Sequence, residues 1–232
     1  PTPDWDHDFG CMLEFGGFKG FAFVSCTGPF DGMACCFDDG TRFVAGLVAT
    51  PLLQYYDATQ SKEFLDSRLL PYLRGVADFY SSYAVLNSST GHYDIPFTCS
   101  QETCAGPTPK AAEHNAHQDL AYARMVFSRL LNLTDPEGPH QAAAPTFERQ
   151  KWMDMLLNLA PFPVVNSKLG PVFAEAVTFT EPQPAPESNA GYPIVHFAAM
   201  HPAAVIGPDS SHELQTLAWN TMLLNNIATD FG

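Results

Sequence analysis

The pattern of apolar and polar positions becomes helical near residue 41. From there, apolar residues recur at the spacing that places side chains on one face of a helix. The first series predicts a helix whose buried face consists of Val44, Leu47, Val48, Leu52 and Tyr55. Pro51 falls inside this series. Because proline lacks an amide hydrogen and clashes with the preceding turn, we expect the helix to kink or restart there.

A second, longer series predicts a helix that begins after Ser61. Serine is a favoured N-cap residue because its hydroxyl can accept a hydrogen bond from a backbone N–H of the first turn. Pro71 lies within this series, as Pro51 does in the first. The apolar face comprises Leu65, Leu69, Tyr72, Leu73, Val76, Tyr80 and Tyr83.

Further helices are predicted at about 114–131, at 147–159 and from about residue 211. At the start of the last helix, Ser210 and Glu213 have the spacing of a capping box. The predicted apolar face of the helix at 114–131 consists of Leu120, Ala123, Phe127, Leu130 and Leu131. That of the last helix consists of Leu214, Leu217, Ala218, Thr221 and Met222.

The segments between these helices are predicted to be loops. They cover residues 87–110, 135–145 and the proline-rich segment 181–187. The first is long for a structureless connection, and such loops often carry function. The loops as a group are rich in aromatic, histidine and acidic residues.

Residues 1–40 differ from the rest of the chain. They are rich in glycine and phenylalanine, and a run such as 21–25 predicts a short strand. We therefore expect two parts. Residues 1–40 form an irregular or β-containing segment, and residues 41–232 form a mainly α domain.

Composition narrows the classes of partner. The chain has 232 residues, of which 46% are hydrophobic and 16% charged, and its formal net charge is −14. A packed core is therefore expected. Nucleic acid is therefore a poor partner and an anionic lipid surface is disfavoured, because binding to either requires clustered lysine and arginine. A neutral substrate such as a sugar is more compatible with this charge. No apolar run is long enough to predict a membrane-spanning helix.

Cysteines and glycosylation motifs indicate an oxidising compartment. There are six cysteines, and Cys99 and Cys104, which flank a short turn, are the simplest local disulfide. The other pairings stay open because sequence alone does not select among them. Asn87 and Asn132 each begin an N-glycosylation motif. We therefore expect a secreted or lumenal glycoprotein, from which a signal segment was removed or which begins partway through a longer protein.

An ordered set of motifs in residues 41–232 is similar to one enzyme family. The chain resembles glycoside hydrolase family 95, the α-L-fucosidase group, and its six-hairpin relatives. The resemblance implies a mainly α fold, an (α/α)6 toroid of helical hairpins. Here the toroid is expected to be incomplete, with about half of the helices. The motifs are Tyr55-Tyr56 with Thr59, Phe64-Leu65, Pro71 and Phe79; Ser100-Gln101-Glu102; His114 to Leu120; Lys151-Trp152; Pro161-Phe162-Pro163; and His196 to Pro202.

The resemblance implies cleavage of a glycosidic bond with inversion at the anomeric carbon. Such cleavage uses a carboxylic acid that protonates the leaving oxygen and a carboxylate that activates water. Glu102, at the position of the family's glutamate, is the candidate acid. For the base, Asp119 at a helix start, Glu175 and the loop residue Asp94 stay open as alternatives. A carboxylate at a helix start is also explained by its favourable interaction with the helix dipole.

Polar and aromatic residues near these acids are candidates for substrate binding. His196, His201, Tyr192 and Asn115 are the candidates, because imidazole and amide groups bond to sugar hydroxyls and flat rings pack on sugar faces. Trp152 is predicted to lie in the core, since it falls on an amphipathic helix. His114, His117 and Asp119 do not make a convincing metal site, and no metal or cofactor is predicted.

Two functional hypotheses follow. The first is a secreted glycoside hydrolase that acts on α-L-fucosides or related glycans. The second is a non-catalytic structural or carbohydrate-binding subunit of an extracellular assembly. In the second case, other protein chains would cover the helix faces that an incomplete toroid exposes.

Overall fold

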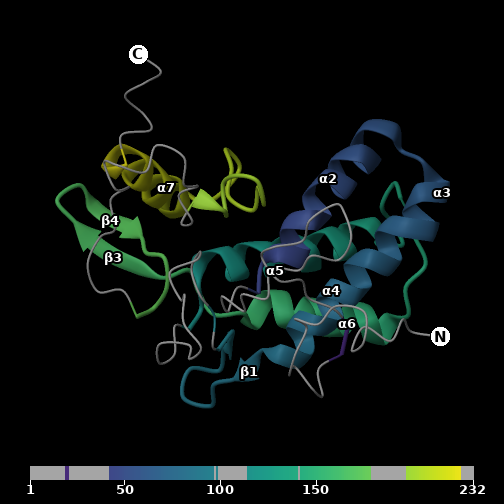
Figure 1. Ribbon diagram of the computed structural model, residues 1–232, viewed down its shortest axis with the longest axis horizontal. Coiled ribbons are helices and arrows are strands. Elements are labelled where there is room, and N and C mark those ends of the chain that lie inside the picture. Colours follow the sequence, from purple (N-terminus) through teal and green to yellow (C-terminus); the bar gives the residue numbers. More distant parts are fainter. Residues whose placement is uncertain are drawn as a thin grey trace, which may run out of the picture.

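The structure is a computed structural model, and it describes residues 19–20, 42–96, 98, 114–140, 142–178 and 197–225. The described part is mainly helical, which confirms the predicted class. Figure 1 shows helices grouped around a central helix, with two short hairpins beside them. Apart from residues 19 and 20, the predicted N-terminal segment 1–40 lies outside the described residues.

The first described helix, α2, runs through its proline without interruption. It spans Val44–Thr59 and contains Pro51, so of the two expected outcomes, a kink or a restart, the restart was wrong. Pro51 is exposed to solvent, and its ring faces away from the packed side of the helix. A proline removes one backbone hydrogen bond of the helix. Here the packing of the opposite face outweighs that loss.

The buried face of α2 also differs from the predicted one. Leu47 and Val48 are exposed, as is Tyr55. The packed side instead carries small residues, because α2 lies very close to the central helix. A Cβ atom at Gly46 would lie 2.5 Å from Cβ of Tyr122. The buried residues of α2 are Val44, Ala45, Gly46, Ala49, Thr50, Leu53 and Tyr56.

The second predicted helix is present but is divided by a π-helical turn. It consists of α3 (Lys62–Phe64), the π-helical turn Leu65–Leu69 and α4 (Leu70–Tyr83). Ser61 is its N-cap as predicted, with Oγ accepting from the N–H of Phe64. Pro71 lies in the first turn of α4, where a missing N–H costs little. The predicted apolar face is confirmed, with Tyr72 alone half-buried.

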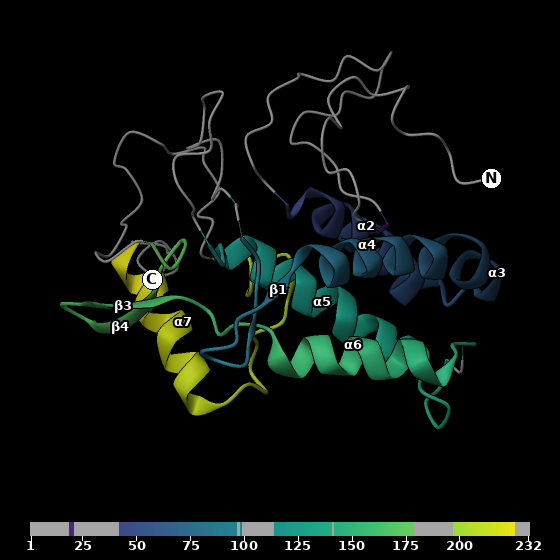
Figure 2. The same cartoon turned by 90° about the horizontal axis from the view of Figure 1, so that it is seen from below.

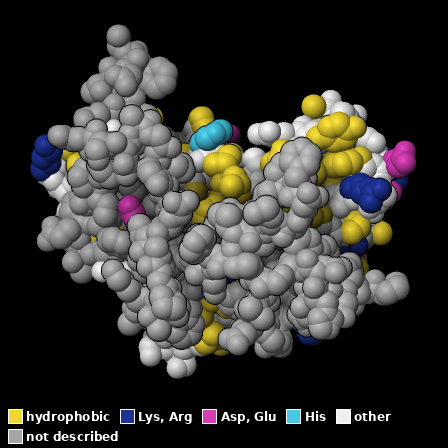
Figure 3. All heavy atoms as spheres, viewed as in Figure 1, with side chains coloured by type: hydrophobic (Ala, Val, Ile, Leu, Met, Phe, Trp, Pro, Cys, Tyr) yellow, Lys and Arg dark blue, Asp and Glu magenta, His cyan; other side chains and the backbone are white. Residues whose placement is uncertain are grey.

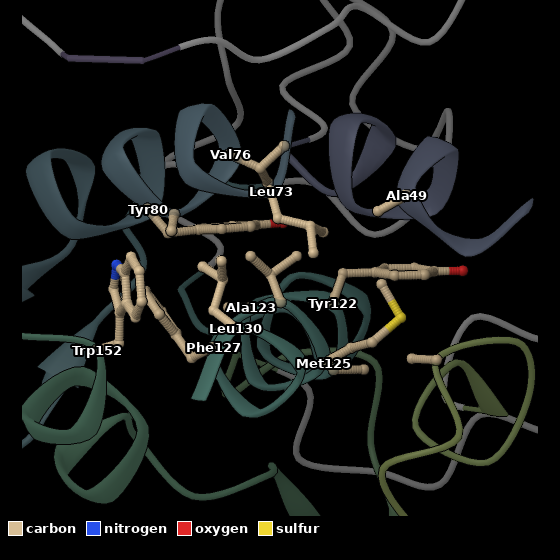
Figure 4. Packing of buried hydrophobic residues seen from close by; sticks show 14 of the residues in the cluster. Ala49, Leu73, Val76, Tyr80, Tyr122, Ala123, Met125, Phe127, Leu130 and Trp152 are labelled. Carbon is tan, nitrogen blue, oxygen red and sulfur yellow. The ribbon is translucent and has the colours of Figure 1, made fainter. Parts of the chain in front are cut away.

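Helix α5 (His117–Leu133) is the centre of the molecule. Figure 2 shows it between α2 and α4 on one side and α6 on the other. Because neighbours surround it, its buried residues occupy almost its whole circumference, well beyond the predicted stripe. Figure 4 shows the core that it forms with its neighbours. Buried residues labelled there are Ala49, Leu73, Val76, Tyr80, Tyr122, Ala123, Met125, Phe127, Leu130 and Trp152.

Helix α6 (Thr146–Asn158) covers α5 with one face and leaves the other open. Trp152 and Met155 are buried, which confirms Trp152 as a core residue. A two-stranded antiparallel hairpin, β1 (Val85–Leu86) and β2 (Tyr93–Asp94), extends into the loop predicted at residues 87–110. It is joined to the end of α6 by a bridge between Tyr93 and Leu159.

A second hairpin and the last helix pack together at one end of the molecule. The hairpin is β3 (Val164–Ser167) and β4 (Gly170–Phe173), which the sequence pattern did not predict. Helix α7 (His212–Leu224) packs on β4. Its N-cap is Ser211, not the predicted Ser210. The hydroxyl of Ser210 instead accepts from Gly207, so it belongs to the preceding turn.

No helix among the described residues has both the length and the apolar character needed to cross a bilayer. On the face in Figure 3, hydrophobic side chains of the described part reach the surface beside lysine and arginine side chains.

Candidate functional site

Four of the residues that the sequence singled out lie around the start of α5: Asp94, Asn115, Asp119 and Glu175. The N-cap residue Ala116 offers no side-chain cap. Backbone groups from a distant segment take its place, since the N–H of His117 donates to the carbonyl oxygen of Glu175 at 2.7 Å. The N–H of Val177 donates in turn to the carbonyl oxygen of His114 at 3.2 Å. These bonds place the segment after β4 against the start of α5.

Asp94 is held by two side-chain amides. Oδ1 of Asp94 accepts from Nδ2 of Asn115 at 2.8 Å, and Oδ2 accepts from Nδ2 of Asn87 at 2.8 Å. The side chain of Asp94 is half-buried at the end of β2. A carboxylate has about four lone-pair positions, so two accepted bonds leave capacity for a further donor.

Asn115 links β2 to the start of α5 through three hydrogen bonds. Besides its bond to Asp94, its Oδ1 accepts from the N–H of Ile95 at 2.7 Å, and its own N–H donates to Ile95 O at 2.9 Å. Its φ is 55°, the left-handed region that asparagine tolerates better than most residues. Asn115 is buried, and these bonds occupy its amide oxygen and part of its amide nitrogen.

Asp119 lies deeper, in the first turn of α5. It is fully buried, and its Oδ2 accepts a hydrogen bond from the hydroxyl of Thr98. A carboxylate in this turn interacts favourably with the positive end of the helix dipole. Burial raises the pKa of the Tyr80 phenol well above its ordinary value, and the nearby charge of Asp119 raises it further.

An aromatic cluster lies beside these acids. The ring of His117 stacks on Phe162 at 4.6 Å between centroids and meets Phe173 edge-on at 4.9 Å. The two phenylalanines contact each other at 5.7 Å. The guanidinium of Arg124 lies over the Phe162 ring at 4.5 Å. This cluster connects the end of α6 and the end of β4 to the first turn of α5.

Four of the predicted site residues or their alternatives are thus brought together. Asp94, Asn115 and Asp119 lie around the first turn of α5, and half-buried Glu175 contacts it through its backbone. His201 is exposed in the segment before α7, where its N–H donates to Phe197 O. Glu102, Tyr192, His196, Cys99 and Cys104 lie outside the described residues.

The two glycosylation motifs lie in different settings. Asn132 is exposed in the last turn of α5, while Thr134 of the same motif is buried and donates to Leu130 O at 2.6 Å. Asn87 is half-buried at the start of the β1–β2 turn, with its amide donating to Asp94.

The described residues contain no group of histidine, cysteine, aspartate and glutamate side chains arranged to hold a metal ion. His117 lies among aromatic rings, and its contacts are those of a core residue.

Sequence reasoning missed the groups that support the acids. Thr98, Phe162, Phe173 and Arg124 were not selected as site residues, and Asn87 was considered only as a glycosylation site. Several of their contacts join segments far apart in the sequence: Thr98 and Asp119 are 21 residues apart, and His117 and Phe173 are 56 residues apart. No periodicity or motif signals such contacts.

Comparison with known proteins does not assign the chain to a family. The chain matches no known family model, and no curated protein matches it significantly.

Proposed function

We propose that this chain is a glycoside hydrolase whose catalytic centre lies at the N-terminal end of α5, and that its helices belong to an incomplete (α/α)6 toroid. One observation carries the proposal. Asp94 and Glu175, which come from distant segments of the chain, meet Asn115 and Asp119 at a single helix start. The toroid and the α-L-fucoside substrate come from the sequence resemblance.

The proposed reaction is hydrolysis with inversion. Glu102 gives its proton to the leaving oxygen while a carboxylate removes a proton from the attacking water, and the water oxygen forms the new bond to the anomeric carbon. In inverting enzymes the two carboxyl groups are about 6.5–9.5 Å apart, which leaves room for that water. The carboxylate is one of Asp94, Asp119 and Glu175.

Burial distinguishes these three acids. Asp94 and Glu175 are half-buried, so water can reach them. Asp119 is fully buried and accepts from Thr98, an arrangement that suits a residue fixing the helix start. Substitution separates these roles, because loss of a base lowers kcat in a folded protein and loss of a buried anchor lowers stability.

The test uses the purified full chain and a panel of aryl glycosides that includes the aryl α-L-fucoside. We expect release of the phenol, and a first-formed sugar of inverted anomeric configuration by NMR. Glu102→Gln should lower kcat by about 10²–10⁴-fold. Glu137→Gln is the matched control, because Glu137 is an exposed loop carboxylate. Wild-type activity on none of the glycosides, or equal activity of the Glu102 and Glu137 variants, would reject the proposal.

The same panel of variants identifies the base. Asp94→Asn, Asp119→Asn and Glu175→Gln are compared for kcat and for thermal midpoint by circular dichroism. The base variant is the one that loses about 10²-fold or more in kcat while its midpoint stays near that of the wild type.

A second candidate function is a non-catalytic, carbohydrate-binding or structural subunit of an extracellular assembly. The outer face of α6 favours it, because Phe147, Met153 and Leu157 are 69%, 43% and 70% exposed. Apolar side chains gathered on one face are typical of an interaction surface. Glycan binding by isothermal calorimetry without any hydrolysis, together with a partner protein on this face, would favour the subunit.

Secretion and glycosylation belong to the same proposal. We expect a disulfide between Cys99 and Cys104 and a glycan at Asn132, whose side chain is exposed. Mass spectrometry of the chain from a secretory host tests both. Peptides compared with and without reduction report the disulfide, and treatment with a glycosidase that removes N-glycans reports the glycan.

A further inference from the structure

Arg124 occupies an unusual position for a cation. It lies on α5, and its Nη2 donates to the carbonyl oxygens of Ala160 at 2.6 Å and Leu159 at 3.3 Å, just past the end of α6. Its Nη1 donates to Leu120 O at 3.4 Å. Carbonyl oxygens at a helix C-terminus carry partial negative charge, so they attract a guanidinium.

The charge of Arg124 is costly where it lies. None of the ion pairs in the described part of the chain includes it. Burial lowers the pKa of its guanidinium to about 10. Removing a charge from water without an opposite charge is unfavourable, and here three carbonyl oxygens and the face of Phe162 offset that cost.

Those contacts lead to the candidate site. The guanidinium lies 4.5 Å from the centroid of Phe162, and Phe162 stacks on His117 at 4.6 Å. Phe173 closes the cluster against both rings. His117 then binds the segment after β4 by donating its N–H to Glu175 O. A chain of direct contacts therefore runs from Arg124 through Phe162 and His117 to Glu175.

We propose that Arg124 is a positioning residue of this site. It contacts no substrate. It fixes the turn after α6 and the ring of Phe162, and through them the ring of His117 and the segment that carries Glu175. Its importance for turnover rests on the proposed hydrolase function. A displacement of about 1 Å in a catalytic group can cost about 10²-fold in rate, so such a support affects kcat more than KM.

Arg149 provides a matched control within the same helix pair. It lies on α6 and binds the other end of α5, with Nη1 donating to Leu131 O at 2.9 Å and to Thr134 Oγ1 at 2.6 Å. Each arginine thus caps the C-terminus of the partner helix. Only Arg124 also contacts the aromatic cluster. A purely structural role predicts equivalent effects at the two positions.

The experiment compares Arg124→Met, Arg124→Lys and Arg149→Met in the full chain. It measures thermal midpoint, kcat and KM on the aryl glycoside, and the NMR signals of histidine rings labelled with ¹⁵N. His117→Gln identifies the signal of His117. Both methionine variants should lose thermal stability. Arg124→Met should also lower kcat by about 10–100-fold with KM within about threefold, and shift the His117 signal. Arg124→Lys should restore part of kcat.

The outcomes separate the two proposals. An unmoved His117 signal in Arg124→Met, or an equal loss of kcat in Arg149→Met, overturns the positioning role while the hydrolase function stands. A wild-type chain that cleaves no glycoside overturns the hydrolase function. In that case the shift of the His117 signal alone decides whether Arg124 positions the cluster.

Discussion

Asn115 donates its side-chain amide to Asp94 at 2.8 Å, and this bond joins the end of β2 to the start of α5. The same amide group accepts from the N–H of Ile95, so one side chain bonds to two neighbouring residues at the end of β2. Two of the acids discussed above, Asp94 and Asp119, are held on either side of this junction. The geometry of the candidate site therefore depends on Asn115.

We expect Asn115→Ala to lower the free energy of unfolding by about 2–5 kcal/mol. Leaving the buried N–H of Ile95 without an acceptor costs about 1–3 kcal/mol. Alanine in the left-handed region adds about 1–2 kcal/mol. Asn115→Gly is the control, because glycine accepts this backbone conformation and loses only the hydrogen bonds. Urea unfolding followed by circular dichroism measures both. An alanine variant as stable as the wild type would show that the junction is not required.

The contact between α2 and α5 gives a second prediction. A Cβ atom at Gly46 would lie 2.5 Å from Cβ of Tyr122, so the helices must separate to admit alanine. We expect Gly46→Ala to destabilise the fold by about 1–3 kcal/mol, even though alanine is the better helix former. Gly207→Ala is the matched control, since nothing lies within 4 Å of its added methyl group. Equal thermal midpoints for the two variants would contradict the close approach.

Two phenylalanines on adjacent helices test the assignment of the core. Phe127 is fully buried on α5, and Phe147 is 69% exposed on α6. Phe127→Ala should cost about 3–5 kcal/mol, because it leaves a cavity. Phe147→Ala should change stability by about 0.5 kcal/mol or less. Guanidinium unfolding of the two variants side by side measures the contrast. A large loss at Phe147 would mean that its face of α6 is covered in solution.

Much of the helical framework is predictable from the sequence, because local signals act within one element. Ser61 caps its helix as expected, and Leu69, Leu73 and Val76 face the core at the predicted spacing. The final helix begins one residue later than its capping-box spacing suggests. The reason is that Ser210 is used by the preceding turn and Ser211 makes the cap.

The errors arise where tertiary contacts overrule local patterns. In α2, close packing on Tyr122 requires small residues, so Ala45 and Ala49 are buried and the larger Leu47 and Tyr55 are exposed. A periodicity count that weights large apolar residues selects the opposite face.

The hairpins and the site supports depend on long-range partners in the same way. The β3–β4 hairpin packs on α7, where Thr221 accepts from the N–H of Phe173. The sequence could name Asp94 and Asn115 as candidates from their residue types. It could not show that Asn87 would complete the pair of amides around Asp94, because that bond depends on the fold of the hairpin.

Buried tyrosines make the fold sensitive to alkali. Burial raises the pKa of the Tyr122 phenol, and it also raises that of Tyr80, which lies near Asp119. A phenol is neutral when protonated, so a folded pKa above the unfolded value of about 10 means that the folded state retains the proton longer. The stabilisation is complete below pH 10 and is lost as the pH rises above it, by about 1.4 kcal/mol per pH unit for each such tyrosine.

Arg124 acts in the opposite direction in the same range. Its folded pKa of about 10 lies below its unfolded value, so above pH 10 the folded state loses this proton first and gains stability. In the described part of the chain, more buried tyrosines have a raised pKa than buried arginines have a lowered one. We therefore expect a net loss of stability above pH 10.

Tyr122→Phe isolates one tyrosine. Above pH 10, its unfolding free energy should fall less steeply than that of the wild type, by about 1.4 kcal/mol per pH unit. Urea titrations between pH 9 and 11 give the two slopes, and absorbance near 295 nm reports when tyrosinate forms. Tyr55→Phe is the control, since that side chain is 53% exposed and meets solvent in both states. Identical slopes for the wild type and Tyr122→Phe would show that the phenol of Tyr122 ionises without unfolding, and hence that this side of α5 is open to water.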